Sequence, residues 1–164
     1  MFSKTVLAGL AALVFVGCRA RTEKDVSADP QFSFMVGKEY RTKGDFILFR
    51  FHKDDPEIQL AEPGITDVPE LAEVSGKKLP FEYRGNLVIG VLPAGSQFKV
   101  VRVVRVDGAP HGSYLYYDGV ITIGKGFEGW EIVPSWLGTR GDILPKFKPE
   151  LVEEITPKAP NGQR

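Results

Sequence analysis

Hydrophobic and polar positions divide the chain into blocks with different patterns. Residues 5–16 form one short apolar run, whereas residues 19–31 are polar and show no apolar period, which predicts a flexible tether. From residue 32 onward, apolar residues recur in short stretches separated by glycine, proline and acidic turns. Such punctuated stretches are typical of β-strands, so we expect a β domain over residues 32–155 and a polar tail over residues 156–164.

The first part of this domain predicts three strands, over residues 32–36, 45–51 and 57–61. Alternate positions of the middle stretch are apolar on both sides. One side carries Phe46 and Leu48, and the other carries Ile47, Phe49 and Phe51. A strand with two apolar faces is covered on both, so we expect residues 45–51 at the centre of a sheet or between two packed layers.

A short helix is predicted over residues 66–76. Asp67 is suited to cap its N-terminus, Pro69 fits the first turn, and Glu70 completes a capping-box spacing. Gly76 is a suitable stop, which leaves roughly two helical turns.

The rest of the domain reads as a β meander. Strands are predicted over residues 86–92, 97–106, 114–123 and 130–133, with a bulge at Gly119 and a hairpin turn over residues 107–112. A second short helix is predicted over residues 150–155. The expected fold class is therefore all-β, a small barrel or sandwich with one or two short helices.

Two stretches of the meander add a resemblance to a known family. In residues 92–100 a glycine turn leads into a strand ending in valine, and residues 129–137 begin with Gly-Trp and end with Leu137. These features resemble bacterial SH3-like domains, and the resemblance covers residues 85–137. It implies a small SH3-like or related barrel.

The N-terminal apolar run has the parts of a secretory signal. Lys4 provides the charged start, and about twelve apolar residues would span roughly 18 Å as a helix, too short for a ~30 Å hydrocarbon core. The run ends in Phe15-Val16-Gly17-Cys18, which resembles the lipobox of bacterial lipoproteins. The resemblance implies that residues 1–17 are cleaved and that Cys18 carries the lipid. The alternative is a plain secreted protein with a stray cysteine.

The lipobox resemblance also implies a location. Two or three acyl chains on Cys18 would hold the protein in a membrane, with residues 18–31 as lipidated cysteine and tether. Arg19 rather than aspartate follows the cysteine, and in enteric-type lipoproteins this implies sorting to the outer membrane, facing the periplasm.

Charge and cysteine content narrow the range of partners. The chain has 21 basic and 21 acidic residues, and this balance gives no reason to expect nucleic acid or a strongly anionic surface as partner. Cys18 has no second cysteine to pair with, so stability has to come from the hydrophobic core.

No spacing of residues predicts a metal site, a cofactor or a catalytic centre. His52 and His111 are far apart, and the acidic residues near His52 lack EF-hand spacing. Ser113 and Asp118 lie near His111 in sequence, but neighbours on one strand seldom converge into a triad. The glycines of residues 124–129 fit a phosphate-loop spacing, yet a strand rather than a helix follows, which favours a hairpin turn.

Aromatic residues are the candidate ligand contacts. We select Tyr114, Tyr116, Trp130 and Trp136, because aromatic rings with a polar tip are favoured at interfaces and sugar-binding faces. Tyr117 falls on the opposite strand face from Tyr116. The alternative is that these rings fill the core of a small barrel. A shared exposed groove would indicate a ligand site, and burial would indicate a core.

These observations favour a non-catalytic, lipid-anchored binding module of the bacterial envelope, with peptidoglycan or a protein as its ligand. The first alternative is a structural or assembly subunit of an envelope complex. The second is a hydrolase, which would need a deep pocket that holds perturbed carboxylates or His52.

Overall fold

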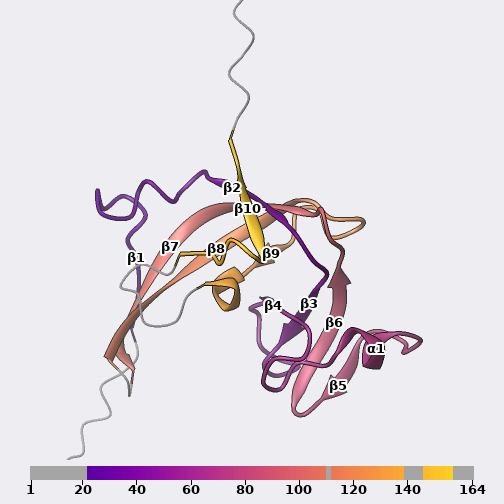
Figure 1. Cartoon of the computed structure of the whole chain (residues 1–164). Helices are drawn as coiled ribbons and strands as arrows, with labels where there is room; N and C mark the ends of the chain where they lie inside the picture. Colours follow the sequence, from indigo (N-terminus) through magenta and orange to yellow (C-terminus); the bar gives the residue numbers. More distant parts are fainter. Residues whose placement is uncertain (1–21, 110–111, 139–145, 157–164) are drawn as a thin grey trace, which may run out of the picture.

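A computed structural model describes residues 22–109, 112–138 and 146–156, which form two antiparallel β-sheets (Figure 1). The long sheet consists of β1 (Thr22–Asp25), β2 (Glu39–Thr42), β7 (Gln97–Ala109), β8 (Gly112–Ile123), β9 (Glu131–Ile132) and β10 (Val152–Ile155). The short sheet consists of β3 (Phe46–Arg50), β4 (Gln59–Ala61), β5 (Phe81–Tyr83) and β6 (Asn86–Leu92). Helical structure is limited to α1 (Leu71–Val74) and the 3₁₀ turn η1 (Pro134–Leu137). The predicted all-β class is confirmed.

The β7–β8 hairpin forms the centre of the long sheet. The strands of this sheet follow the order β10–β2–β7–β8–β9. Strand β1 pairs with the same edge of β7 as β2 does, but further along β7. An irregularity in the pairing falls between Val100 and Arg102, opposite Gly119, so the expected bulge lies on the partner strand. Both strands continue through most of the turn expected at residues 107–112, which makes the hairpin longer than predicted.

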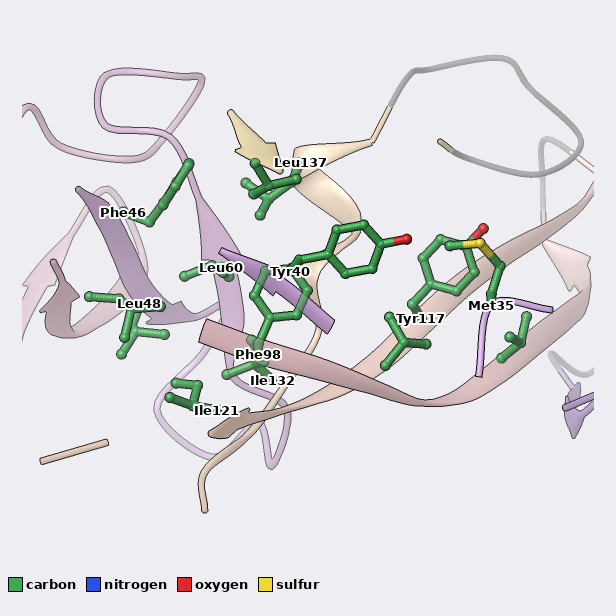
Figure 2. Close-up of a cluster of buried hydrophobic side chains, with 14 of the residues drawn as sticks. Met35, Tyr40, Phe46, Leu48, Leu60, Phe98, Tyr117, Ile121, Ile132 and Leu137 are labelled. Atoms are coloured by element: carbon green, nitrogen blue, oxygen red, sulfur yellow. The ribbon is translucent and has the colours of Figure 1, made fainter. Parts of the chain in front are cut away.

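The main core lies between the two sheets. Figure 2 shows Phe46 and Leu48 of β3 facing Phe98 and Ile121 of the hairpin. The opposite face of the short sheet carries a second core, with Ile47 and Phe49 packed against Val68 and Val74. Residues 46–49 are therefore buried on both faces, as the two apolar sides predict, whereas Phe51 lies beyond the end of β3 and is 38% exposed.

The segment before β2 differs from its prediction. Residues 32–36 form successive turns rather than a strand, with hydrogen bonds from Met35 N to Phe32 O and from Val36 N to Ser33 O. Phe32 and Met35, three residues apart, both enter the main core. β1 and β2 run in the same direction along one edge of β7, and the turns between them carry the chain away from that edge and back to it. This excursion is what places Phe32 and Met35 in the core.

The prediction of a flexible tether over residues 19–31 is also wrong for the part that the structure describes, residues 22–31. Within residues 22–31, β1 pairs with residues 104–107 of β7, and Val26 N donates to Val103 O at 2.9 Å. All four side chains of β1 are exposed, so the strand is held by backbone groups and leaves no apolar pattern in the sequence. Cys18 lies outside the described residues.

Two helix predictions need correction. Residues 152–155 form a strand, β10, whose pairing with β2 is joined by ion pairs from Arg41 to Glu153 and from Lys38 to Glu154. Helix α1 starts at Leu71, because Asp67 has a left-handed backbone (φ 62°) and Glu70 forms the capping box with Glu73 instead.

Candidate functional site

The two tyrosines selected on β8 share a strand face but not an environment. Tyr114 lies opposite Val106 and is 44% exposed, whereas Tyr116 lies opposite Val104 and is 6% exposed. Tyr116 packs with Val104, Val106 and Val133 in a small cluster of its own. Tyr117 points the other way, into the main core.

The two tryptophans line different hollows. Trp136 packs against Phe49 and Phe51, and it borders a hollow that includes Glu62 and Lys148. Trp130 stands edge-on to Phe127, with ring centroids 5.0 Å apart, and borders a hollow on the short sheet. The structure therefore does not bring the four selected aromatic residues into one groove.

The Trp130 hollow also contains an arginine. Arg50 is the last residue of β3 and lies opposite Leu87 on β6, so both side chains project from the same face of the short sheet. The hollow measures about 290 Å³. Its lining consists of Arg50, Ile58, Pro80, Leu87, Ile89 and Trp130, and we call it the Arg50–Trp130 hollow.

Within the part of the chain that the structure describes, the Arg50 guanidinium has no partner. Its Nε is buried and makes no hydrogen bond, and no ion pair joins it to a described carboxylate. Glu82 lies in the same register row, beyond Leu87, without pairing to it. A buried donor without an acceptor costs about 1–3 kcal/mol, and more when it is charged.

This arrangement is suited to an anion with an apolar part. A guanidinium binds carboxylate or phosphate through parallel hydrogen bonds, and an incoming oxygen would satisfy Nε. The indole of Trp130 and the side chains of Leu87 and Ile89 would cover an adjoining apolar surface, such as one face of a sugar ring. Trp130 is one of the four aromatic residues selected from the sequence, whereas Arg50 was not selected because it reads as the polar end of an apolar strand.

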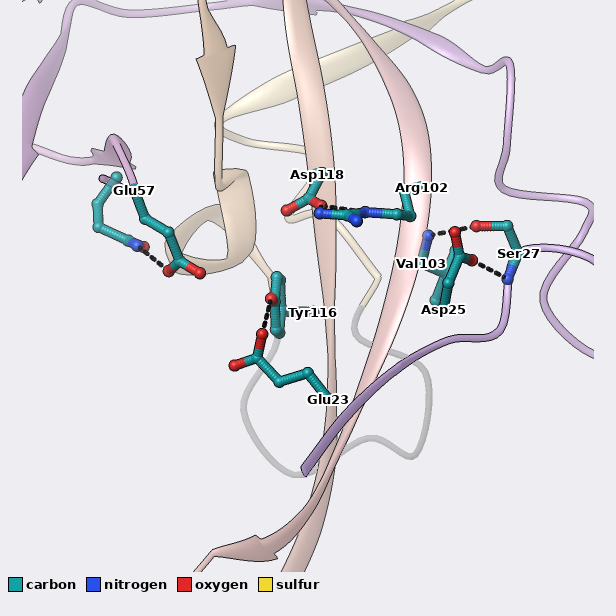
Figure 3. Close-up of polar contacts among 9 residues, drawn as sticks. Glu23, Asp25, Ser27, Glu57, Arg102, Val103, Tyr116 and Asp118 are labelled. Atoms are coloured by element: carbon teal, nitrogen blue, oxygen red, sulfur yellow. Dashed lines mark hydrogen bonds and ion pairs between the residues drawn. The ribbon is translucent and has the colours of Figure 1, made fainter. Parts of the chain in front are cut away.

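A second polar cluster lies beside Tyr116, and its side chains bond to one another (Figure 3). Arg102 Nε donates to Asp118 Oδ2 at 2.6 Å, and the Tyr116 hydroxyl donates to Glu23 Oε2 at 3.3 Å. Burial raises the pKa of Asp118, and the hydrogen bond and charge of Arg102 partly oppose that shift. The Tyr116–Glu23 bond joins β1 to β8, and the Arg102–Asp118 pair joins β7 to β8, so these contacts hold the three strands together.

In the glycine-rich loop of residues 124–129, the carboxylate of Glu128 occupies the position that a bound phosphate would take. Glu128 Oε1 accepts from Gly124 N at 3.0 Å, and Glu128 Oε2 accepts from Gly126 N at 2.8 Å. The backbone donors that a phosphate would need are therefore occupied, and the loop joins β8 to β9 as a turn. The interpretation as a hairpin turn agrees with this geometry.

Candidate metal and catalytic residues are placed as follows. No group of three potential metal ligands occurs among the described residues. Ser113 Oγ donates to Asp107, and His52 is exposed in the turn after β3. His111 lies outside the described residues. No helix in the described ranges is long and apolar enough to cross a membrane.

Comparison with protein families, with characterised proteins and with solved structures found no match to this chain. The SH3-like resemblance of residues 85–137 thus stays a prediction from the sequence.

Proposed function

We propose that this protein is a lipid-anchored, non-catalytic binding module of the bacterial envelope that holds peptidoglycan in the Arg50–Trp130 hollow. The observation that carries this proposal is the Arg50 guanidinium, whose buried Nε has no hydrogen-bond partner among the described residues and which lines the same hollow as the Trp130 indole. The anchor is the lipid on Cys18 that the lipobox resemblance implies, with the outer membrane as its location and the periplasm as the side it faces.

Peptidoglycan has the chemistry that this hollow would recognise. Its sugar rings present apolar faces that stack on indoles, and its peptides carry carboxylates that pair with guanidinium groups. The hollow is also open, so a polymer can reach it without entering the protein.

The test is co-sedimentation of the full-length protein, in a mild detergent, with purified peptidoglycan. We expect saturable binding that Arg50→Gln weakens by roughly 10-fold or more, because the charged hydrogen bonds are lost. Arg105→Gln is the matched control, since Arg105 is an exposed arginine on β7 that pairs with Asp107.

Two results would contradict the proposal: absence of sedimentation, or equal binding by the Arg50→Gln protein and the wild type. In either case the assembly-subunit alternative gains weight, and crosslinking of the lipidated protein in cells would be used to capture its partner.

A further inference from the structure

A third hollow lies on the long sheet where β2 meets β10, and it is distinct from the Arg50–Trp130 hollow. It measures about 400 Å³. Its wall includes the rings of Phe34, Tyr40, Tyr117 and Phe147, and its rim includes Lys43 and Lys146; we call it the Tyr40 pocket. A concave site of this size with mostly aromatic walls and a few polar groups is typical of small-molecule binding.

Tyr40 is the unusual group in this pocket. It is 6% exposed, and its ring packs edge-on against Phe147, with centroids 4.6 Å apart. Figure 2 shows its hydroxyl pointing toward Tyr117. No hydrogen bond joins that hydroxyl to any residue in the described ranges, and the hydroxyl is not among the fully buried polar atoms.

The Tyr40 hydroxyl is a donor under ordinary conditions. Burial raises the pKa of Tyr40 far above its usual value, and the nearby Glu154 and Tyr117 add to the shift. Burial likewise raises the pKa of Tyr117, to about 12. Both rings therefore stay neutral and protonated at physiological pH.

The charges around the pocket leave a positive excess. Its two carboxylates are paired, Glu154 with Lys38 at 2.8 Å and Glu153 with Arg41 at 2.9 Å. Lys43 Nζ donates to a neutral group, the carbonyl oxygen of Pro149, at 2.6 Å. Lys146 has no ion pair with a described residue. The uncompensated charges at the rim are thus two ammonium groups.

We propose that the Tyr40 pocket binds a small organic carboxylate with a flat apolar body. The body lies among the aromatic rings, one carboxylate oxygen accepts from the Tyr40 hydroxyl, and Lys146 with Lys43 supplies the counter-charge. This site is separate from the peptidoglycan hollow and does not depend on it.

The test uses 3-phenylpropionate as the probe, titrated by calorimetry into the full-length protein in a mild detergent. We expect saturable one-to-one binding that weakens about 10-fold in Tyr40→Phe and at least 3-fold in Lys146→Gln. Neutral 3-phenylpropanol, with the same ring, should bind at least 10-fold more weakly. Lys125→Gln is the control, because Lys125 is an exposed lysine in the β8–β9 turn.

Thermal unfolding of the same variants separates binding from folding. Tyr40→Phe keeps the ring and removes a hydroxyl that bonds to none of the described residues, so it should unfold at or above the wild-type temperature. The proposal is overturned if 3-phenylpropionate does not bind, if Tyr40→Phe binds it as the wild type does, or if 3-phenylpropanol binds equally well.

Discussion

Buried tyrosines in this protein differ in what their hydroxyl groups contact. Tyr116 and Tyr40 have the same exposed fraction, 6% each, yet Tyr116 donates to Glu23 and Tyr40 has no partner in the described part of the chain. The first hydroxyl contributes to the fold, whereas the second is available to a ligand. The difference changes what substitution of each ring should do.

For Tyr116 we predict a loss of stability. Tyr116→Ala should lower the free energy of unfolding by about 3–5 kcal/mol because it leaves a cavity among Val104, Val106 and Val133. Tyr116→Phe should cost about 1 kcal/mol, the value of one hydrogen bond. Urea denaturation measures both, with Tyr114→Ala as the exposed control. Loss of peptidoglycan binding in a fully stable Tyr116→Ala protein would instead make Tyr116 a ligand contact.

For Glu128 we predict a pH-dependent contribution. Backbone N–H groups of Glu128 itself, Gly124 and Gly126 hold the pKa of this carboxyl below its ordinary value of 4.5. Such a group stabilises the folded state above 4.5, and this stabilisation is lost as the pH falls through the lowered pKa. Glu128→Gln should thus be less stable than the wild type near neutral pH, and the gap should close in acid. Urea denaturation of the two proteins near neutral pH and in acid measures this difference in the free energy of unfolding. A difference that is the same at the two pH values would refute the prediction.

Strand alternation explains how much of the residue-level picture could be predicted. It placed Tyr116 and Tyr117 on opposite faces of one strand, which the structure has. It did not show which face is covered, because that depends on elements distant in sequence. Arg50 became informative only because the fold places it in one hollow with Trp130 and pairs it with no carboxylate among the described residues.

At the scale of elements, β6 depends on a glycine at one position. A Cβ on Gly90 would lie 2.6 Å from Cζ of Phe127, whose ring covers that point of the strand. We predict that Gly90→Ala lowers the free energy of unfolding by about 1–3 kcal/mol, because the rigid ring has to move. Adding Phe127→Leu should recover part of the loss, as a double-mutant cycle would measure.

Gly44→Ala is the control for that cycle, because nothing lies within 4 Å of its Cβ position. Strictly additive effects of Gly90→Ala and Phe127→Leu would show that the two residues are not in conflict.

The attachment of β1 leads to a prediction on Ser27. Val103 is fully buried, and its N–H donates to Ser27 Oγ at 3.0 Å. Ser27→Ala should cost about 1–3 kcal/mol and speed hydrogen exchange at the Val103 amide, because that donor loses its acceptor. Ser33→Ala, in the exposed turn that follows, is the control. An unchanged exchange rate would restore the interpretation of this segment as a loose tether.

Edge strands explain which elements the sequence did not reveal. The strand over residues 86–92 carries enough apolar residues to be predicted at its observed bounds. By contrast, β1 has only exposed side chains, and β10 has two exposed glutamates at its centre. Both are strands because β7 and β2 each present an open edge, and that depends on the fold as a whole.

At the scale of the whole molecule, the two proposed sites draw on different sheets. The Arg50–Trp130 hollow opens on the short sheet, and the Tyr40 pocket lies between β2 and β10 of the long sheet. We predict that they act independently. Arg50→Gln should leave 3-phenylpropionate affinity unchanged, and Tyr40→Phe should leave peptidoglycan sedimentation unchanged. Cross-effects larger than about 3-fold in either assay would show that the sites are coupled.

The pairing of β1 also bears on how the protein would stand on a membrane. Thr22 lies opposite Asp107, close to the far end of the hairpin, and only residues 19–21 separate it from Cys18. Four residue steps reach at most about 14 Å. With Cys18 in the bilayer, the hairpin end would rest near the lipid surface. Figure 1 shows that end directed away from the short sheet, so the Arg50–Trp130 hollow would be held out toward the cell wall at a set height.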